Sequence, residues 1–145
     1  MAFTLPNWRP LLGIILLLFP ANRGEAFYGK YPIRNFRPTD YKAGIQNIDF
    51  AQNRDMQLFV ANNLGVLAYN GHDWAVHAFN TGKKERSLVF DEAHNRLYVG
   101  SQGTFGYFEE DWNYVALDEL LPAESRDFDE VWDVYLHQSR VYFCT

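Results

Sequence analysis

Cysteine and long apolar runs are scarce in this sequence of 145 residues. The single cysteine, Cys144, has no second cysteine with which to form an internal disulfide. Because it lies in the apolar run VYFCT, we expect it to be a small buried side chain. The unbroken apolar run Leu11–Phe19 has nine residues, whereas a membrane-spanning helix needs about 20. This run is therefore too short to serve as a membrane anchor.

Basic side chains are also few. The chain has 13 Lys and Arg against 18 Asp and Glu, and removal of residues 1–26 would leave 11 basic and 17 acidic residues, a net charge of −6. The one basic cluster, Lys83-Lys84-Glu85-Arg86, is interpreted as a solvated loop. Because affinity for a phosphate backbone comes from clustered Lys and Arg, we expect no nucleic-acid binding by this segment.

Helical periodicity is almost missing. Only Leu117–Leu121 hints at an amphipathic helix, and Pro122 ends it. The aromatic share of 17% suits strands, where flat and β-branched side chains pack on a pleated surface. The sequence therefore predicts an all-β fold.

The first 26 residues have the pattern of a signal peptide. Arg9 gives a positive start, Leu11–Phe19 is the apolar run, and Gly24-Glu25-Ala26 supplies small residues for cleavage. Residues 27–44 follow as a lead-in arm, in which Pro32 and Pro38 should break any helix and leave extended or turn geometry, with pairing as an outer strand one option. Export is the expected consequence.

A repeat organises the rest of the chain. The stretch Gln46–Trp74 has a second copy about forty residues later, with Gly65–Tyr69 over Gly103–Tyr107 at an offset of 38. The same offset carries Asp73-Trp74 onto Asp111-Trp112. Offsets of 39 and 40 align the upstream strands, since repeats change length in their turns. The shared residues, which we interpret as structural, are Gly65, Tyr69, Trp74, Gly103, Tyr107 and Trp112.

Short runs separated by turn residues predict four strands in each copy. The predicted strands are residues 45–50, 57–61, 66–69 and 75–79, then 87–90, 96–99, 105–108 and 114–117. Four antiparallel strands in about forty residues is typical of one β-propeller blade. We expect blades at 45–83 and 84–124 and a partial third at 125–145, where Val141-Tyr142-Phe143 matches Leu97-Tyr98-Val99 at an offset of 44. Since closed propellers have about four to eight blades, the chain is expected to be the N-terminal piece of a larger propeller.

The sequence contains no recognisable catalytic, metal-binding or cofactor-binding pattern. The four histidines lack ligand spacing, so no metal site and no cofactor are predicted. The acidic clusters, at 109–111 and 127–133, could pair carboxylates for glycoside hydrolysis but are more typical of a charged rim. Residues that recur in each repeat are usually scaffold, so ligand contacts are better sought where the copies differ. By that rule Asn63, His72 and Gln102 are the candidate ligand-binding residues.

Two stretches carry a family resemblance. The segment 62–74, NNLGVLAYNGHDW, and the segment 99–108, VGSQGTFGYF, resemble the two-component-regulator propeller repeat. With the lead-in Pro32–Phe36, the chain looks like the start of a bacterial triple-tyrosine regulator of the LuxR-type helix-turn-helix class. Ile48, Asn70 and Arg54-Asp55 depart from the usual repeat residues.

This resemblance implies a function. In such regulators an exported propeller precedes a triple-tyrosine domain, a membrane helix and a cytoplasmic DNA-binding output, and none of the last three lies in these 145 residues. We expect a non-enzymatic sensor segment on the periplasmic face of the inner membrane, binding an oligosaccharide or another small extracellular ligand. Its other expected partners are the remaining blades and the downstream domains, and it would meet the membrane only through the missing C-terminal part. The alternatives are a secreted propeller enzyme acting on polysaccharide and a protein-binding scaffold.

Overall fold

The structure is a computed structural model that describes residues 32–78 and 83–145. The chain divides into two units, and the second, Asn35–Thr145, holds the helices and strands described here. The predicted signal peptide, residues 1–26, lies outside the described residues, as do residues 27–31 of the lead-in arm and Phe79 of the fourth predicted strand.

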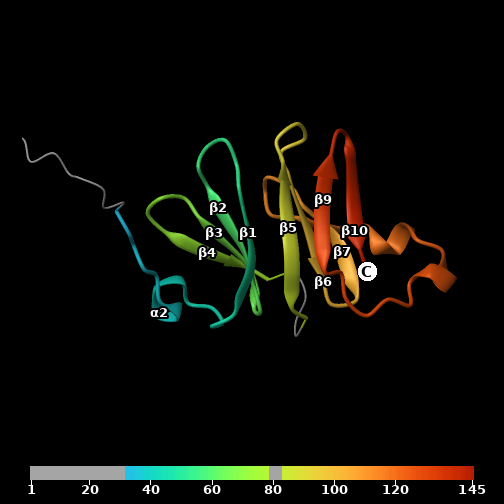
Figure 1. Cartoon of the computed structure of the whole chain (residues 1–145), viewed down its shortest axis with the longest axis horizontal. Coiled ribbons are helices and arrows are strands. Elements are labelled where there is room, and N and C mark those ends of the chain that lie inside the picture. Colours follow the sequence, from blue (N-terminus) through green and yellow to red (C-terminus); the bar gives the residue numbers. More distant parts are fainter. Residues whose placement is uncertain (1–31, 79–82) are drawn as a thin grey trace, which may run out of the picture. The chain divides into compact units, whose positions relative to one another are not determined.

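Two four-stranded antiparallel sheets and one hairpin make up the second unit (Figure 1). The first sheet contains β1 (Asn47–Gln52), β2 (Leu58–Asn62), β3 (Gly65–Tyr69) and β4 (Trp74–His77). The second contains β5 (Glu85–Asp91), β6 (Arg96–Ser101), β7 (Thr104–Phe108) and β8 (Tyr114–Ala116). The hairpin pairs β9 (Asp133–His137) with β10 (Arg140–Cys144). The prediction of a mainly β chain is confirmed, and the strand ends differ from those predicted by no more than two residues.

The lead-in arm corrects one prediction. Pro38 begins a helical turn, α2 (Pro38–Tyr41), instead of preventing one. Proline suits the first helical position because its missing N–H would have no partner there, and the Asp40 carboxylate accepts the backbone N–H of Arg37 at 2.7 Å. The described part of the arm contains no strand and does not extend the first sheet. Two further short helices, η1 (Asp118–Leu120) and η2 (Ala123–Ser125), lead towards β9.

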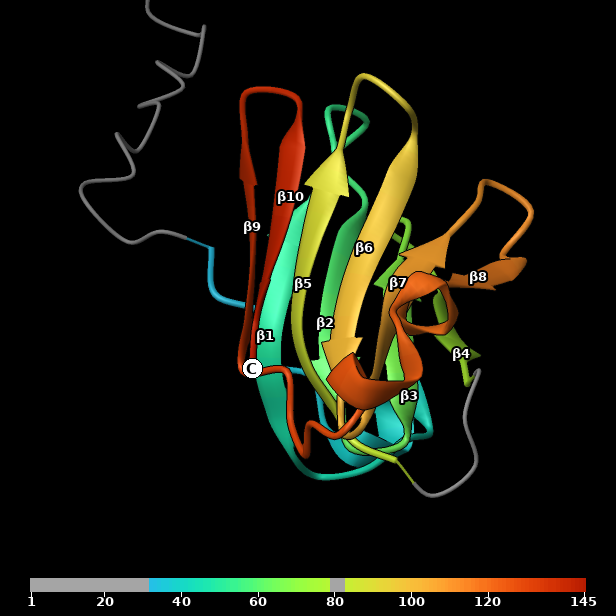
Figure 2. The same cartoon turned by 90° about the vertical axis from the view of Figure 1, so that its right-hand side faces the viewer.

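The first strands of the three elements lie next to one another. β1 contacts β5, and β5 contacts β9. Figure 2 shows these three strands on one side of the stack, with β4 and β8 on the other. The strands of each four-stranded sheet therefore run from the side of the stack where the first strands meet to the opposite side.

Three apolar clusters hold the layers together. Phe59, Val66, Leu97 and Val99 belong to the cluster between the two sheets. A second cluster joins the second sheet to the hairpin, and its buried members are Tyr98, Phe105, Val131 and Val134. The third packs Tyr41 of α2 on Val60 and Leu67, on the remaining face of the first sheet. Both sheets thus have buried apolar residues on both faces, although Phe50 of β1 is 74% exposed.

The strand pairing shows how closely the two sheets match. Each has an irregularity in its first strand, at Asn47–Asp49 and at Glu85–Ser87. Leu58 pairs with Tyr69 as Leu97 pairs with Phe108, so β2 and β3 correspond to β6 and β7 at an offset of 39. The first strands, β1 and β5, correspond at an offset of 38, because Asp49 opposes Ala61 as Ser87 opposes Gly100. The sheets therefore repeat strand by strand, bulge included.

This register corrects the offset of 38 inferred for the third strands. Tyr69 corresponds to Phe108 instead of Tyr107, and Trp74, which opposes Tyr69, corresponds to Tyr114 instead of Trp112. A shift of one residue sends side chains to the opposite face of a sheet. The glycines explain the error, since Gly103 is a turn residue with φ +64° whereas Gly65 is the first residue of β3 with φ +141°. Gly65 and Gly103 serve neighbouring, not equivalent, positions.

A hydrogen bond between neighbouring sheets also repeats. The Asp49 carboxylate accepts the backbone N–H of Leu88 at 2.9 Å and the Ser87 hydroxyl at 2.9 Å. Ser87, which corresponds to Asp49, accepts the backbone N–H of Val134 at 3.1 Å through its hydroxyl oxygen. At this position, each sheet thus accepts one backbone N–H from the next element.

We expect Asp49→Ala to lower the free energy of unfolding by about 1–2 kcal/mol, because it leaves the part-buried Leu88 N–H without an acceptor. Asp49→Asn, which keeps an oxygen there, should lose less. Urea denaturation measures both, with the exposed Asp73→Ala as the matched control. A loss for Asp49→Ala no larger than that for Asp73→Ala would contradict this role.

Candidate functional site

A groove of about 530 Å³ opens between the two sheets and is the best candidate for a binding site. It lies where the β1–β2, β3–β4, β5–β6 and β7–β8 loops approach one another. Its described lining comprises Asn53, Asp55, Gln57, Phe59, Asn70, Phe90, Asn95, Leu97, Phe108, Glu109, Glu110 and Trp112. Both sheets and four loops therefore contribute to one hollow.

Aromatic rings form the apolar part of this groove. Phe59 of β2 stacks on Phe90 of β5, with ring centroids 5.3 Å apart and planes 6° apart. Trp112 packs edge-on against Phe59 and Phe108 at 6.1 and 5.4 Å. Such contacts fix ring orientation, since aromatic pairs prefer offset or edge-to-face geometry.

Trp112 owes its position to an unusual backbone. It is a non-glycine residue with φ +65° in the β7–β8 loop, where its backbone N–H donates to the Glu109 carbonyl at 3.0 Å. Its indole stacks on the His77 ring of the first sheet, with centroids 3.4 Å apart. Burial lowers the pKa of His77, so the imidazole is neutral at pH 7 and the stack is one of uncharged rings. A loop of the second sheet is thereby held against the first.

Polar groups form the rim. The described lining has four side-chain amides and three carboxylates, and neither Lys nor Arg is among it. Amides donate and accept hydrogen bonds at once, whereas carboxylates only accept when ionised. The rim therefore suits hydroxyl groups or a cation and disfavours an anion.

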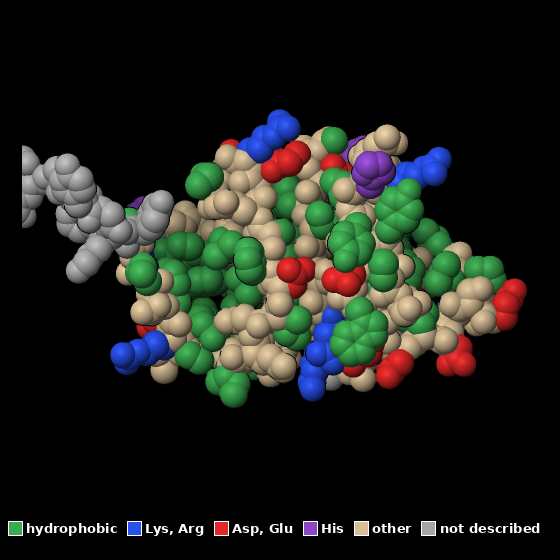
Figure 3. All heavy atoms as spheres, in the orientation of Figure 1, with side chains coloured by type: hydrophobic (Ala, Val, Ile, Leu, Met, Phe, Trp, Pro, Cys, Tyr) green, Lys and Arg blue, Asp and Glu red, His purple; other side chains and the backbone are tan. Residues whose placement is uncertain are grey.

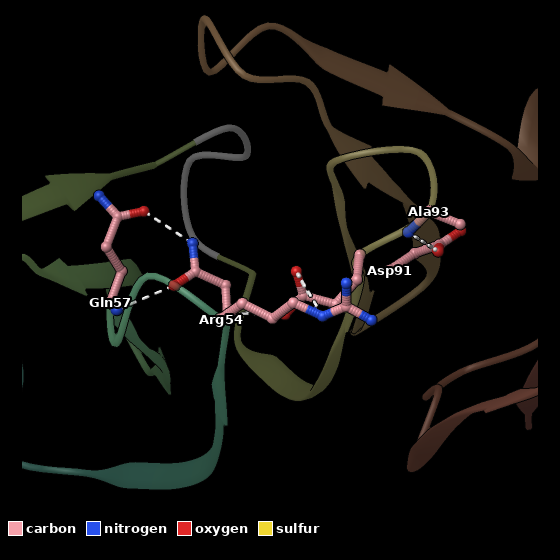
Figure 4. A network of polar contacts seen from close by, with 6 residues as sticks. Arg54, Gln57, Asp91 and Ala93 are labelled. Carbon is pink, nitrogen blue, oxygen red and sulfur yellow. Dashed lines mark hydrogen bonds and ion pairs between the residues drawn. The ribbon is translucent and has the colours of Figure 1, made fainter.

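Hydrogen bonds shape the loops at this rim (Figure 4). In the β1–β2 loop the Asn53 amide donates to the Gln57 side-chain oxygen at 2.9 Å and accepts the Gln57 backbone N–H at 2.9 Å. The loops of the two sheets are joined where the Arg54 backbone N–H donates to the Glu92 carboxylate at 2.7 Å. The rim is thus ordered across the junction of the sheets.

The β5–β6 loop uses an acid where the first sheet uses an amide. Asp91, which corresponds to Asn53, accepts the Ala93 N–H at 2.9 Å and lies 2.7 Å from the His94 ring nitrogen. Burial acts to raise the pKa of Asp91, but these hydrogen bonds outweigh it and the pKa is lowered. Asp91 is therefore ionised at neutral pH and fixes its loop.

The residues predicted to bind ligand do not come together. Asn63 and Gln102 occupy equivalent places in the β2–β3 and β6–β7 turns, and His72 lies in the β3–β4 turn at the other end of the first sheet. None of the three lines the groove. Trp112 does line it, whereas Trp74 packs with Phe36, Tyr41 and Tyr69 on the far face of the first sheet.

A second hollow, of about 470 Å³, lies beside β7 and β8. Several of its polar side chains are already engaged with the protein, since the Thr104 hydroxyl donates to Asp118 at 2.7 Å and the Lys83 ammonium to the Gly103 carbonyl at 3.3 Å. Burial raises the pKa of Tyr114 to about 12, so its hydroxyl stays protonated. The first groove leaves more groups for a ligand.

Among residues 32–78 and 83–145, no group of three or more His, Cys, Asp and Glu could hold a metal ion. No helix in the same ranges is long and apolar enough to cross a membrane. Comparisons with protein-family models, curated proteins and solved structures found no match. The regulator resemblance drawn from the sequence therefore stays a prediction.

Proposed function

We propose that this chain is part of an exported β-propeller that senses an extracellular ligand for a bacterial signal-transduction regulator. The propeller assignment is supported by two sheets of one plan, a third element that starts the same way, and first strands that lie side by side. The groove between the sheets carries the functional part of the proposal.

A neutral polyhydroxylated ligand, such as an oligosaccharide, fits the chemistry of the groove. Its sugar rings would lie on the aromatic side, against Trp112 and Phe90, and its hydroxyl groups would meet the amides and carboxylates of the rim. The three carboxylates would repel phosphate or carboxylate groups at close range. We therefore favour an uncharged glycan fragment over an anionic one.

The groove also offers a way to transmit occupancy. Its lining comes from both sheets, so a ligand held there contacts the β1–β2 loop of one and the β7–β8 loop of the other. A ligand shifts a conformational equilibrium only if it binds one arrangement better than another. We propose that the bound ligand favours one relative setting of the two sheets, stabilised by the Trp112–His77 stack.

We expect isothermal titration calorimetry of the exported chain against neutral oligosaccharides to detect binding. Glu110→Ala should weaken it several-fold and Trp112→Ala about 10-fold or more, because a well-packed aromatic contact is worth about 1–2 kcal/mol in a binding site. Glu110 is exposed, so its replacement leaves the fold intact. Trp132→Ala, at an exposed tryptophan outside the groove, is the matched control.

Three other results would count against this function. Absence of binding across the panel would contradict it, and tighter binding of anionic sugars would contradict the ligand class. Release of new reducing ends from a polysaccharide would instead favour the enzyme alternative, with Glu109 and Glu110 as its carboxylates.

A further inference from the structure

One face of the β9–β10 hairpin points away from the second sheet and is exposed in the described part of the chain. It carries Asp133, Tyr135, Tyr142 and Cys144, with Tyr135 55% exposed and Tyr142 46% exposed. Hydrophobic side chains are visible over this hairpin in Figure 3. Cys144, which the sequence predicted to be buried, is exposed here.

The same positions are covered in both earlier sheets. Asp133 opposes Cys144 as Ser87 opposes Gly100, and Tyr135 opposes Tyr142 as Val89 opposes Tyr98. In the first sheet the corresponding pairs are Asp49 with Ala61 and Ala51 with Phe59. Tyr98 is only 8% exposed because the hairpin covers it, and Phe59 only 4% because the second sheet does. The equivalent surface is buried under the next element in the first sheet and again in the second sheet. The open face of the hairpin is the third copy of this surface.

The hydrogen-bonding series points the same way. Asp49 accepts a backbone N–H from the second sheet, and Ser87 accepts one from the hairpin. Asp133 occupies the next position of that series, with its carboxylate on the open face.

Small residues accompany these acceptors. The residue opposite the acceptor is Ala61 in the first sheet, Gly100 in the second and Cys144 in the hairpin. A Cβ added at Gly100 would lie 2.6 Å from a Val131 methyl carbon, which shows how closely the next element approaches there. Cys144 is likewise small enough to permit a close neighbour.

We infer that this face docks a further β-sheet of the same plan. The first strand of that sheet would donate one backbone N–H to the Asp133 carboxylate and pack an apolar side chain against Tyr135 and Tyr142. This inference rests on the proposed propeller and names the partner of its third element.

The first sheet of a second copy is a poorer occupant. Phe50 is the residue of that sheet that corresponds to Leu88 and Val134, the two donors of the series. Its N–H already donates to its neighbour Asp49 at 2.8 Å. A sheet whose first strand has an unengaged N–H fits Asp133 better.

The single cysteine makes the test direct. Because Val141–Phe143 match Leu97–Val99 at an offset of 44, Thr145 corresponds to Ser101, and a second copy of residues 102–145 can follow Thr145 in register. This extended chain completes the third sheet and supplies a second copy of the β9–β10 hairpin, which begins a fourth sheet. The copied cysteine is changed to serine, so that the rate of reaction with Ellman's reagent reports on Cys144 alone.

We expect Cys144 to react quickly in the natural chain and about 10-fold or more slowly in the extended chain, because a thiol under a docked sheet reacts only when that sheet opens. Asp133→Ala should restore much of the rate in the extended chain and leave the natural chain unchanged. A polar flexible extension of equal length is the control and should give no protection.

Equal rates of Cys144 reaction in the natural and extended chains would overturn the inference. This holds also if the rates are equal because the extension stays unfolded. Protection that survives Asp133→Ala would overturn the role of Asp133. If sedimentation velocity shows that the natural chain self-associates, and Tyr142→Lys abolishes this while exposing Cys144, the face belongs to a second copy. Because the assay contains no ligand and Asp133 does not line the groove, these results do not depend on ligand binding by the groove.

Discussion

Gly106→Ala is expected to lower the free energy of unfolding by about 3 kcal/mol, near the upper end for overpacking of a filled site. Gly106 lies in β7, and a Cβ added there would come 2.2 Å from the Val115 carbonyl oxygen and 2.7 Å from the Tyr114 hydroxyl. A backbone atom cannot turn aside as the end of a flexible side chain can. β8 would have to move away from β7, and the contacts of Tyr114 with the core between the sheets would be lost.

Chemical denaturation followed by tryptophan fluorescence measures this loss. Gly71→Ala is the matched control, because an added Cβ there meets no atom within 4 Å. Gly71 has φ +97°, so this control should still cost about 1 kcal/mol in backbone strain. Equal losses for the two variants would show that the close approach of β8 does not constrain Gly106.

Glu85→Gln is expected to stabilise the protein at pH 8 and to have much less effect at pH 5. Glu85, the first residue of β5, is only 1% exposed, so the interpretation of residues 83–86 as a solvated loop is wrong at this position. One of its carboxyl oxygens has no hydrogen-bond partner among the described residues. Burial raises the pKa of Glu85 to about 7, although hydrogen bonds from the backbone N–H groups of Glu85 and Gly65 act to lower it. The folded protein therefore keeps a proton that the unfolded chain releases near its ordinary value of 4.5.

The sign of the effect follows from this difference in bound protons. Below pH 4.5 both states hold the proton, and the neutral Glu85 imposes no charge burial. Between pH 4.5 and 7 the unfolded chain binds fewer protons, so stability falls as the pH rises. Above pH 7 the loss of stability is complete. A pKa difference of this size between the folded and unfolded states corresponds to up to about 3 kcal/mol of unfolding free energy.

Urea denaturation of both proteins at pH 5 and pH 8 tests this expectation. The difference in unfolding free energy between Glu85→Gln and the natural chain should increase towards pH 8 in favour of the variant. Glu124→Gln, at an exposed carboxylate, is the control and should leave the pH dependence unchanged. A parallel pH dependence in all three proteins would mean that Glu85 ionises normally in the fold.

Local sequence patterns were enough to locate the strands. Alternating apolar residues and turn signals such as Asn70-Gly71 predicted all eight strands of the two sheets. These signals act over a few residues, which is why they survive in a single sequence. The same reasoning failed at Pro38, because a proline that interrupts a helix can also begin one.

Register was harder to predict because it depends on pairing between strands. Matching Gly65 to Gly103 displaced the third strands by one residue and made Trp74 equivalent to Trp112. The structure places these tryptophans in different surroundings, one beside α2 and the other between the two sheets. A displacement of one residue thus made two tryptophans with different surroundings look equivalent.

The groove itself could be predicted only in part. The sequence identifies the acidic cluster that includes Glu109 and Glu110, and it marks Trp112 as a repeated residue. The rest of the lining comes from loops that meet only after the sheets stack, and the sequence contains no direct signal for that meeting. Asn63, His72 and Gln102 are positions at which the copies differ. Such a difference identifies a variable turn but does not say at which end of a sheet the turn lies.

The central claim is that a ligand binds between the first two sheets, and NMR of the ¹⁵N-labelled exported chain tests it most directly. On titration with a neutral oligosaccharide, we expect the largest shifts at the Trp112 indole N–H and at the side-chain amides of Gln57 and Asn95. The Trp74 indole and the amides of Asn63 and Gln102 should move little, because they lie outside the groove. Shifts centred on Asn63 and Gln102, with Trp112 unchanged, would contradict the account and move the site to the opposite end of the sheets.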